Sequence, residues 1–183
     1  MSVLQLHPSS QNRFNVLLTE DRPHADEHWI RQLIRLLEPQ GVVTHLARTG
    51  QEAVSLTQTV AFHAAVVDLG TPVGAHAGRH GSEKGRFVAP QPAAGTPGGL
   101  WLLEVLRHVP AKPPVVLLGA PPASRRQAQD LLRQALRLGA FSVMRKPVDV
   151  ERVLGVIRKL VDRQYSGNWP QPGAEQDRGD WFE

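Results

Sequence analysis

The feature that most restricts the fold of this chain is a repeated alternation of short apolar runs with longer segments of helical periodicity. Phe14–Thr19 is a nearly continuous apolar run, typical of a strand buried on both faces, and it ends abruptly at Glu20. In the next segment Leu33 and Leu37 recur at helical spacing, and Gly41 follows as a stop. This pattern predicts a strand followed by a helix.

The alternation continues for five rounds. The predicted strands are 14–19, 42–47, 64–69, 114–118 and 141–144, and the predicted helices are 24–38, 51–59, 100–108, 124–138 and 150–161. Asp149 is placed to cap the last helix. Parallel strands need crossover connections, and right-handed crossover helices cover both faces of a sheet. The sequence therefore predicts an α/β fold with a doubly wound, five-stranded parallel sheet.

Two glycine- and proline-rich segments fall outside this alternation. The chain holds 16 Gly and 15 Pro residues, and the segment 72–97 is rich in both and has scarcely any apolar periodicity. A second such segment, 166–183, follows the last predicted helix. We therefore expect an N-terminal arm at 1–11, one domain at 12–165 with a loop insertion at 72–97, and a C-terminal tail at 166–183.

Composition excludes several classes of function. The chain contains no cysteine, so it has no disulfide framework, thiolate zinc site or cysteine nucleophile, and a cytoplasmic location is the default expectation. No apolar run approaches the ~18 residues of a membrane span, so no membrane association is expected. The net charge of +4 is a small surplus, and nucleic-acid binding is not expected. His76 and His80 are four residues apart, but the glycines around them disfavour a helical metal-binding pair.

Charged residues gather at the expected carboxyl ends of the strands. Glu20, Asp21, Asp68, Gly119 and Lys146 all stand at such ends, where open parallel sheets bind ligands. Taken singly, each acid could equally be a solvated residue at a turn. Three carboxylates brought together would repel one another unless a cation joined them, and their oxygens suit Mg²⁺. With a lysine beside them, they predict a carboxylate nucleophile that attacks phosphorus.

The residues around these positions resemble the receiver domain of two-component response regulators. The resemblance rests on four segments, namely the acid pair that ends Leu17-Leu-Thr-Glu-Asp21, Val66-Val-Asp-Leu-Gly-Thr-Pro72, Gly98-Gly-Leu-Trp-Leu-Leu103 and Gly139-Ala-Phe-Ser-Val-Met-Arg-Lys-Pro147. It extends over 12–71 and 98–165. It implies a flavodoxin-like (βα)5 fold with strand order 2-1-3-4-5.

The resemblance also implies a role in a phosphorelay. Asp68 would accept a phosphoryl group from a histidine kinase or a phosphotransfer protein. Asp21, Asp68 and the backbone carbonyl of Gly70 would bind Mg²⁺ directly, and Glu20 would act through water. Lys146 would pair with the phosphoryl oxygens, next to a cis peptide before Pro147. The protein would be a signalling module and not an enzyme. It would act on a downstream protein that the sequence does not identify, and the sequence leaves open whether it forms a homodimer.

Two positions depart from the family pattern. The family usually has Ser or Thr at the end of the fourth strand and an aromatic residue in the fifth, where this chain has Gly119 and Val143. Gly119 could also simply give room for a tight turn, and Val143 is an ordinary strand residue. These departures favour an alternative in which a receiver-like module is regulated independently of phosphorylation. A Mg²⁺-dependent phosphatase with Asp68 as nucleophile is a further alternative, but Gly70 stands where such enzymes carry a second acid.

The predicted helix 124–138 is amphipathic. Arg126, Arg133 and Arg137 share one face, and the opposite face carries apolar residues, Ala128, Leu131, Leu132 and Ala135. The basic face could be an ordinary solvated surface or could meet an acidic protein partner or phosphates.

Overall fold

The computed structural model describes residues 14–21, 27–74, 89–120 and 123–165. Several of the predictions made above fall outside these ranges, namely the arm at 1–11, residues 75–88 of the loop insertion at 72–97 with His76 and His80, and the tail at 166–183.

The five predicted strands form one parallel sheet, which confirms the predicted fold. Its strands are β1 (Phe14–Thr19), β2 (Val42–Ala47), β3 (Ala64–Asp68), β4 (Val115–Gly119) and β5 (Ser142–Arg145), in the order β2-β1-β3-β4-β5. In the register of the central pair, Asp68 lies opposite Leu118. The reversal of strand order between β1 and β3 places the end of β3 at the position where open parallel sheets bind ligands.

The helices match the prediction to within a few residues. They are α1 (Glu27–Leu37), the short 3-10 helix η2 (Glu38–Gln40), α2 (Gly50–Thr57), α3 (Gly98–Leu106), α4 (Arg125–Arg137) and α5 (Val150–Gln164). As predicted, Asp149 caps α5, and its side chain accepts a hydrogen bond from the amide of Glu151 at 3.0 Å. Helix α3 begins two residues earlier than predicted, at Gly98.

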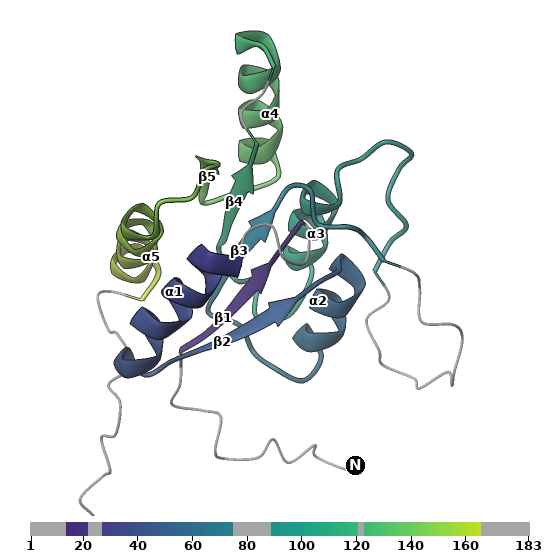
Figure 1. The fold of residues 1–183 in the computed structure, drawn as a ribbon. Helices are drawn as coiled ribbons and strands as arrows, with labels where there is room; N and C mark the ends of the chain where they lie inside the picture. The colour runs from purple at the N-terminus through teal and green to yellow at the C-terminus, as the bar shows by residue number, and fades with distance from the viewer. Residues whose placement is uncertain (1–13, 22–26, 75–88, 121–122, 166–183) are drawn as a thin grey trace, which may run out of the picture.

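The apolar side chains form two cores, one on each face of the sheet. Successive strand residues point to opposite faces, so Leu17 joins the core under α2 and α3, whereas Leu18 joins the core under α1 and α5. Trp101 of α3 is buried in the first core and Trp29 of α1 in the second. Figure 1 shows α1 and α5 on one side of the sheet and α2 and α3 on the other.

Helix α4 packs more loosely than the others. Of the apolar face expected from the sequence, Ala135 alone is buried and Leu132 is 45% exposed. Leu136, outside that face, is 56% exposed. Figure 1 shows α4 extending from the carboxyl end of β4, away from the other helices. None of the helices that the structure describes has both the length and the apolar character needed to span a lipid bilayer.

Candidate functional site

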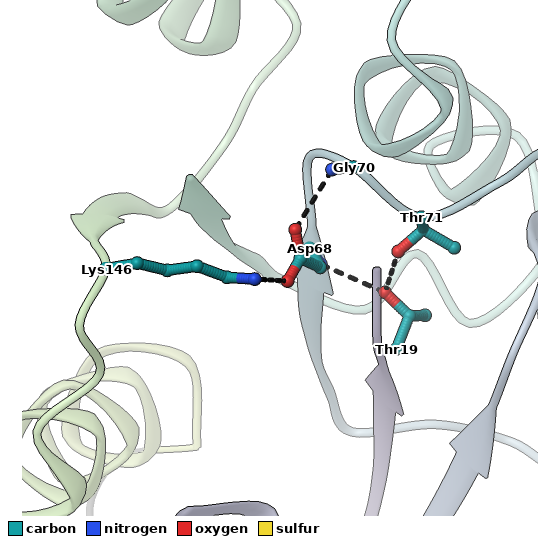
Figure 2. Close-up of polar contacts among 5 residues, drawn as sticks. All are labelled: Thr19, Asp68, Gly70, Thr71 and Lys146. Atoms are coloured by element: carbon teal, nitrogen blue, oxygen red, sulfur yellow. Dashed lines mark hydrogen bonds and ion pairs between the residues drawn. The ribbon is translucent and has the colours of Figure 1, made fainter. Parts of the chain in front are cut away.

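Buried Asp68 and half-buried Lys146 form an ion pair at the carboxyl end of the sheet. Asp68 is the last residue of β3, and its Oδ2 atom lies 2.5 Å from Nζ of Lys146, whose side chain is 17% exposed. Lys146 directly follows β5, and its backbone amide donates to the carbonyl of Gly119 at 2.8 Å. The peptide between Lys146 and Pro147 is cis, as the resemblance implied. Figure 2 shows the lysine side chain reaching across to the aspartate.

A tight turn holds the other oxygen of Asp68. The amide of Gly70 donates to Oδ1 of Asp68 at 3.0 Å, and the amide of Thr71 donates to the backbone carbonyl of Asp68 at 3.1 Å. Each carboxylate oxygen of Asp68 therefore has a partner of its own (Figure 2). Two positively polarised groups that converge on one carboxylate would also stabilise negative charge added to it.

Asp21 lies against Gly70, the residue whose amide binds Asp68. A Cβ atom added to Gly70 would lie 2.5 to 2.7 Å from the carboxyl atoms of Asp21, so this carboxylate rests directly against the glycine. Within the described ranges no three acidic or histidine side chains gather into a metal-binding group. The oxygen donors near Gly70 are two carboxylates and a backbone carbonyl, and such a set fits Mg²⁺, which binds few carboxylates and keeps several waters.

Glu20 turns toward β2 and has a different neighbour. Its side chain is only 5% exposed, and Oε1 lies 3.7 Å from Nε of Arg48, at the end of β2. The amide of Arg48 in turn donates to Oε2 of Glu52 at 2.8 Å. Of the three predicted acids, the structure places Asp21 and Asp68 each beside Gly70 and pairs Glu20 with Arg48.

Two threonines behind Asp68 were missed by the sequence reasoning. Thr19 and Thr71 are fully buried, and their hydroxyl oxygens lie 2.6 Å apart. Thr19 Oγ1 also accepts the backbone amide of Asp68 at 2.9 Å. Figure 2 shows both side chains directed at each other beneath the turn. The only sequence signal is a hydroxyl residue at the end of an otherwise apolar strand.

The two positions that depart from the family pattern lie together on the α4 side. Gly119 ends β4, and Val143 lies in β5; both line a hollow of about 130 Å³ beneath Leu131 and Leu132 of α4. A Cβ atom on Gly119 would lie 2.5 Å from Cδ1 of Leu69, so the leucine covers this glycine. The packing of Leu69 therefore accounts for glycine at position 119. The same glycine leaves this position without the hydroxyl group that the family usually has there.

Comparison with known proteins identifies the fold. No protein-family model and no curated protein matches the sequence. Solved structures do match. The chain is 19% identical to a CheY-like response regulator receiver domain protein from Methanospirillum hungatei JF-1, with a TM-score of 0.59, covering 84% of this chain and 98% of the other.

Two further structures extend this likeness. The receiver domain of the Francisella response regulator 1452 is 21% identical, with a TM-score of 0.57, covering 83% of this chain and 99% of the other. A response regulator from Burkholderia pseudomallei, solved with a phosphorylated aspartic acid, a calcium ion and citrate, is 23% identical. Its TM-score is 0.53, and the match covers 87% of this chain and 75% of that one. The chain therefore has the fold of response-regulator receiver domains.

Proposed function

We propose that this receiver-fold chain accepts a phosphoryl group on Asp68 and signals through contacts with other proteins. The observation that carries the proposal is the ion pair of Asp68 and Lys146, with the Gly70 amide on the second carboxylate oxygen. The donor would be a phosphohistidine on a histidine kinase or a phosphotransfer protein. We further propose that the domain spans 12–165 and acts in the cytoplasm.

The transfer is a simple displacement at phosphorus. A carboxylate oxygen of Asp68 forms a bond to phosphorus while the bond between phosphorus and the donor's histidine nitrogen breaks, and that nitrogen keeps the electron pair. Lys146 faces the reacting carboxylate and would neutralise the charge on the phosphoryl oxygens. The Gly70 amide holds the carboxylate in a fixed orientation, which lowers the entropic cost of the reaction.

Asp21, Asp68 and the backbone carbonyl of Gly70 would hold Mg²⁺, with Glu20 acting through water. When bound, the ion neutralises charge on the transferring phosphoryl group. Asp21 rests against Gly70 because the glycine has no side chain in the way. The calcium ion and phosphoaspartate of the Burkholderia pseudomallei structure support this assignment.

Phosphorylation is tested with Mg²⁺ and acetyl phosphate. The full chain should gain the mass of one phosphoryl group, and the Asp68→Asn variant should gain none. Asp130→Asn is the matched control, because Asp130 is an exposed acid on α4 that pairs only with Arg133 among the described residues. Equal labelling of the wild type and Asp68→Asn, or none in either, would refute the proposal.

A second candidate is a receiver-like interaction module regulated independently of phosphate. Gly119 and the leucine that covers it favour this candidate, because no hydroxyl can reach a phosphoryl group from that position. The two candidates differ in one measurable property. If phosphorylation of Asp68 leaves both oligomeric state and partner affinity unchanged, the second candidate is correct.

A further inference from the structure

The turn that carries Asp68 is bonded at both ends to one buried oxygen atom. Thr19 Oγ1 accepts the amide of Asp68 at 2.9 Å and lies 2.6 Å from the hydroxyl of Thr71. All three residues are buried. The backbone of Asp68 therefore cannot shift relative to β1 without changing the contact that holds Thr71 (Figure 2).

The residues that follow Thr71 are bonded to the start of α2. The amide of Gly50 donates to the carbonyl of Pro72 at 2.8 Å, and the amide of Gln51 donates to the carbonyl of Val73 at 2.9 Å. These two amides belong to the first turn of the helix, where no intrahelical acceptor is available to them. The turn at Asp68 is thus linked to the N-terminus of α2 through the backbone that runs from Thr71 to Val73 and its hydrogen bonds.

Helix α3 also packs directly against the turn. A Cβ atom on Gly98 would lie 2.0 Å from the carbonyl oxygen of Thr71, and one on Gly99 would lie 2.4 Å from that of Asp68. The amide of Gly99 also donates to the carbonyl of Leu69 at 3.2 Å. The turn is therefore confined by the backbone of α3 as well as by its hydrogen bonds to the start of α2.

We propose that Thr19 and Thr71 are positioning residues that couple modification of Asp68 to the N-terminus of α2. The inference rests on the proposed phosphorylation of Asp68. It holds that phosphorylation first changes the structure at the start of α2. At the two α4-side positions where the family usually carries a hydroxyl and a ring, this chain has Gly119 and Val143, which have neither. The coupling element is the hydroxyl pair, whose two oxygens link β1 to the turn.

Amide hydrogen exchange on the full chain tests the coupling. Mg²⁺ with beryllofluoride serves as the probe, and fluorine NMR reports whether it binds. In the wild type, binding should change the exchange rates of the Gly50 and Gln51 amides about fivefold or more. The amide of Phe141, bonded to Val115 at the far end of the sheet, should not respond.

Hydroxyl variants separate positioning from packing. Thr71→Val keeps the shape but removes the hydroxyl, so beryllofluoride should bind while the response at Gly50 and Gln51 is lost. Thr71→Ser keeps the hydroxyl and should restore the response. A full response in Thr71→Val would overturn the proposal.

The failure of this proposal is distinguishable from failure of the proposed function. If beryllofluoride does not bind to the wild type, phosphorylation of Asp68 itself is refuted. If it binds and the Gly50 and Gln51 amides do not respond, the coupling alone is refuted, whether or not any variant folds. Should Thr71→Val not fold, Thr19→Val removes the same oxygen pair and is judged in the same way.

Discussion

The side chain of Leu69 fills the space into which any side chain at Gly119 would extend. A Cβ atom on the glycine would lie 2.5 Å from Cδ1 of the leucine. The residue after the phosphorylation candidate and the last residue of β4 therefore constrain each other directly.

This contact predicts non-additive effects on stability. Gly119→Ser should cost about 1 kcal/mol in the wild-type background, because Leu69 must rotate away. The same substitution should cost less in a Leu69→Ala background, with a coupling free energy of about 1 kcal/mol in a urea-unfolding double-mutant cycle. Strictly additive free energies of unfolding would show that the two residues do not compete for space.

The approach of Asp21 to Gly70 predicts a metal-binding defect. Gly70→Ala would push the Asp21 carboxylate aside, and the affinity for Mg²⁺ should fall on the order of tenfold in a calorimetric titration. Gly155→Ala is the control, because a Cβ atom there meets nothing within 4 Å. The control should keep its Mg²⁺ affinity and gain about 0.5 to 1 kcal/mol of stability. Wild-type affinity in Gly70→Ala would contradict the proposed ligand set.

The ammonium group of Lys146 should be needed for the transfer reaction. Lys146→Met removes the charge beside Asp68 but keeps an unbranched side chain. Phosphorylation by acetyl phosphate should slow on the order of a hundredfold, as when one preorganised donor is removed from an active site. Lys159→Met, on the exposed face of α5, should react at the wild-type rate. An unchanged rate in Lys146→Met would remove the lysine from the mechanism.

Stability should fall in mild acid because of His63 and His45. Burial lowers the pKa of both side chains from the ordinary value of 6.5. Nδ1 of His63 also accepts the amide of Asn15 at 3.0 Å, which requires this nitrogen to be unprotonated. The unfolded chain therefore binds more protons below pH 6.5, so the free energy of unfolding should decrease as the pH falls below that value.

The variant His63→Asn isolates the contribution of His63 to the pH dependence of stability. It removes the titrating group, so the free energy of unfolding should depend less steeply on pH below the ordinary histidine pKa of 6.5. His45 keeps its contribution in this variant. An identical pH dependence in the wild type and in His63→Asn would show that His63 does not titrate differently on folding.

The sheet could be predicted from the sequence because its residues are buried on both faces. The runs around Leu17 and Val66 are nearly continuously apolar, and a parallel sheet covered on both sides requires such runs. The start of α3 could not be placed, because Gly98 enters the helix for a tertiary reason. Its missing side chain lets the carbonyl of Thr71 approach, and this contact has no periodic signal.

The residues of the site that stand at strand ends could be predicted from the sequence. The contacts that depend on the direction of a side chain could not. Asp68 and Lys146 follow from their places at the ends of β3 and β5. The partner of Glu20 and the hydroxyl pair of Thr19 and Thr71 depend on which way each side chain points. Long-range pairs of this kind leave no regular pattern along the chain.

The loose packing of α4 has an evolutionary consequence. A helix whose single buried residue is Ala135 leaves most of its thirteen positions free to mutate with little loss of folding stability. The turn at Asp68, enclosed by Gly98, Gly99 and the N-terminus of α2, permits few substitutions. The fold thus separates a surface on α4 that can diversify quickly from a candidate site that tolerates little change.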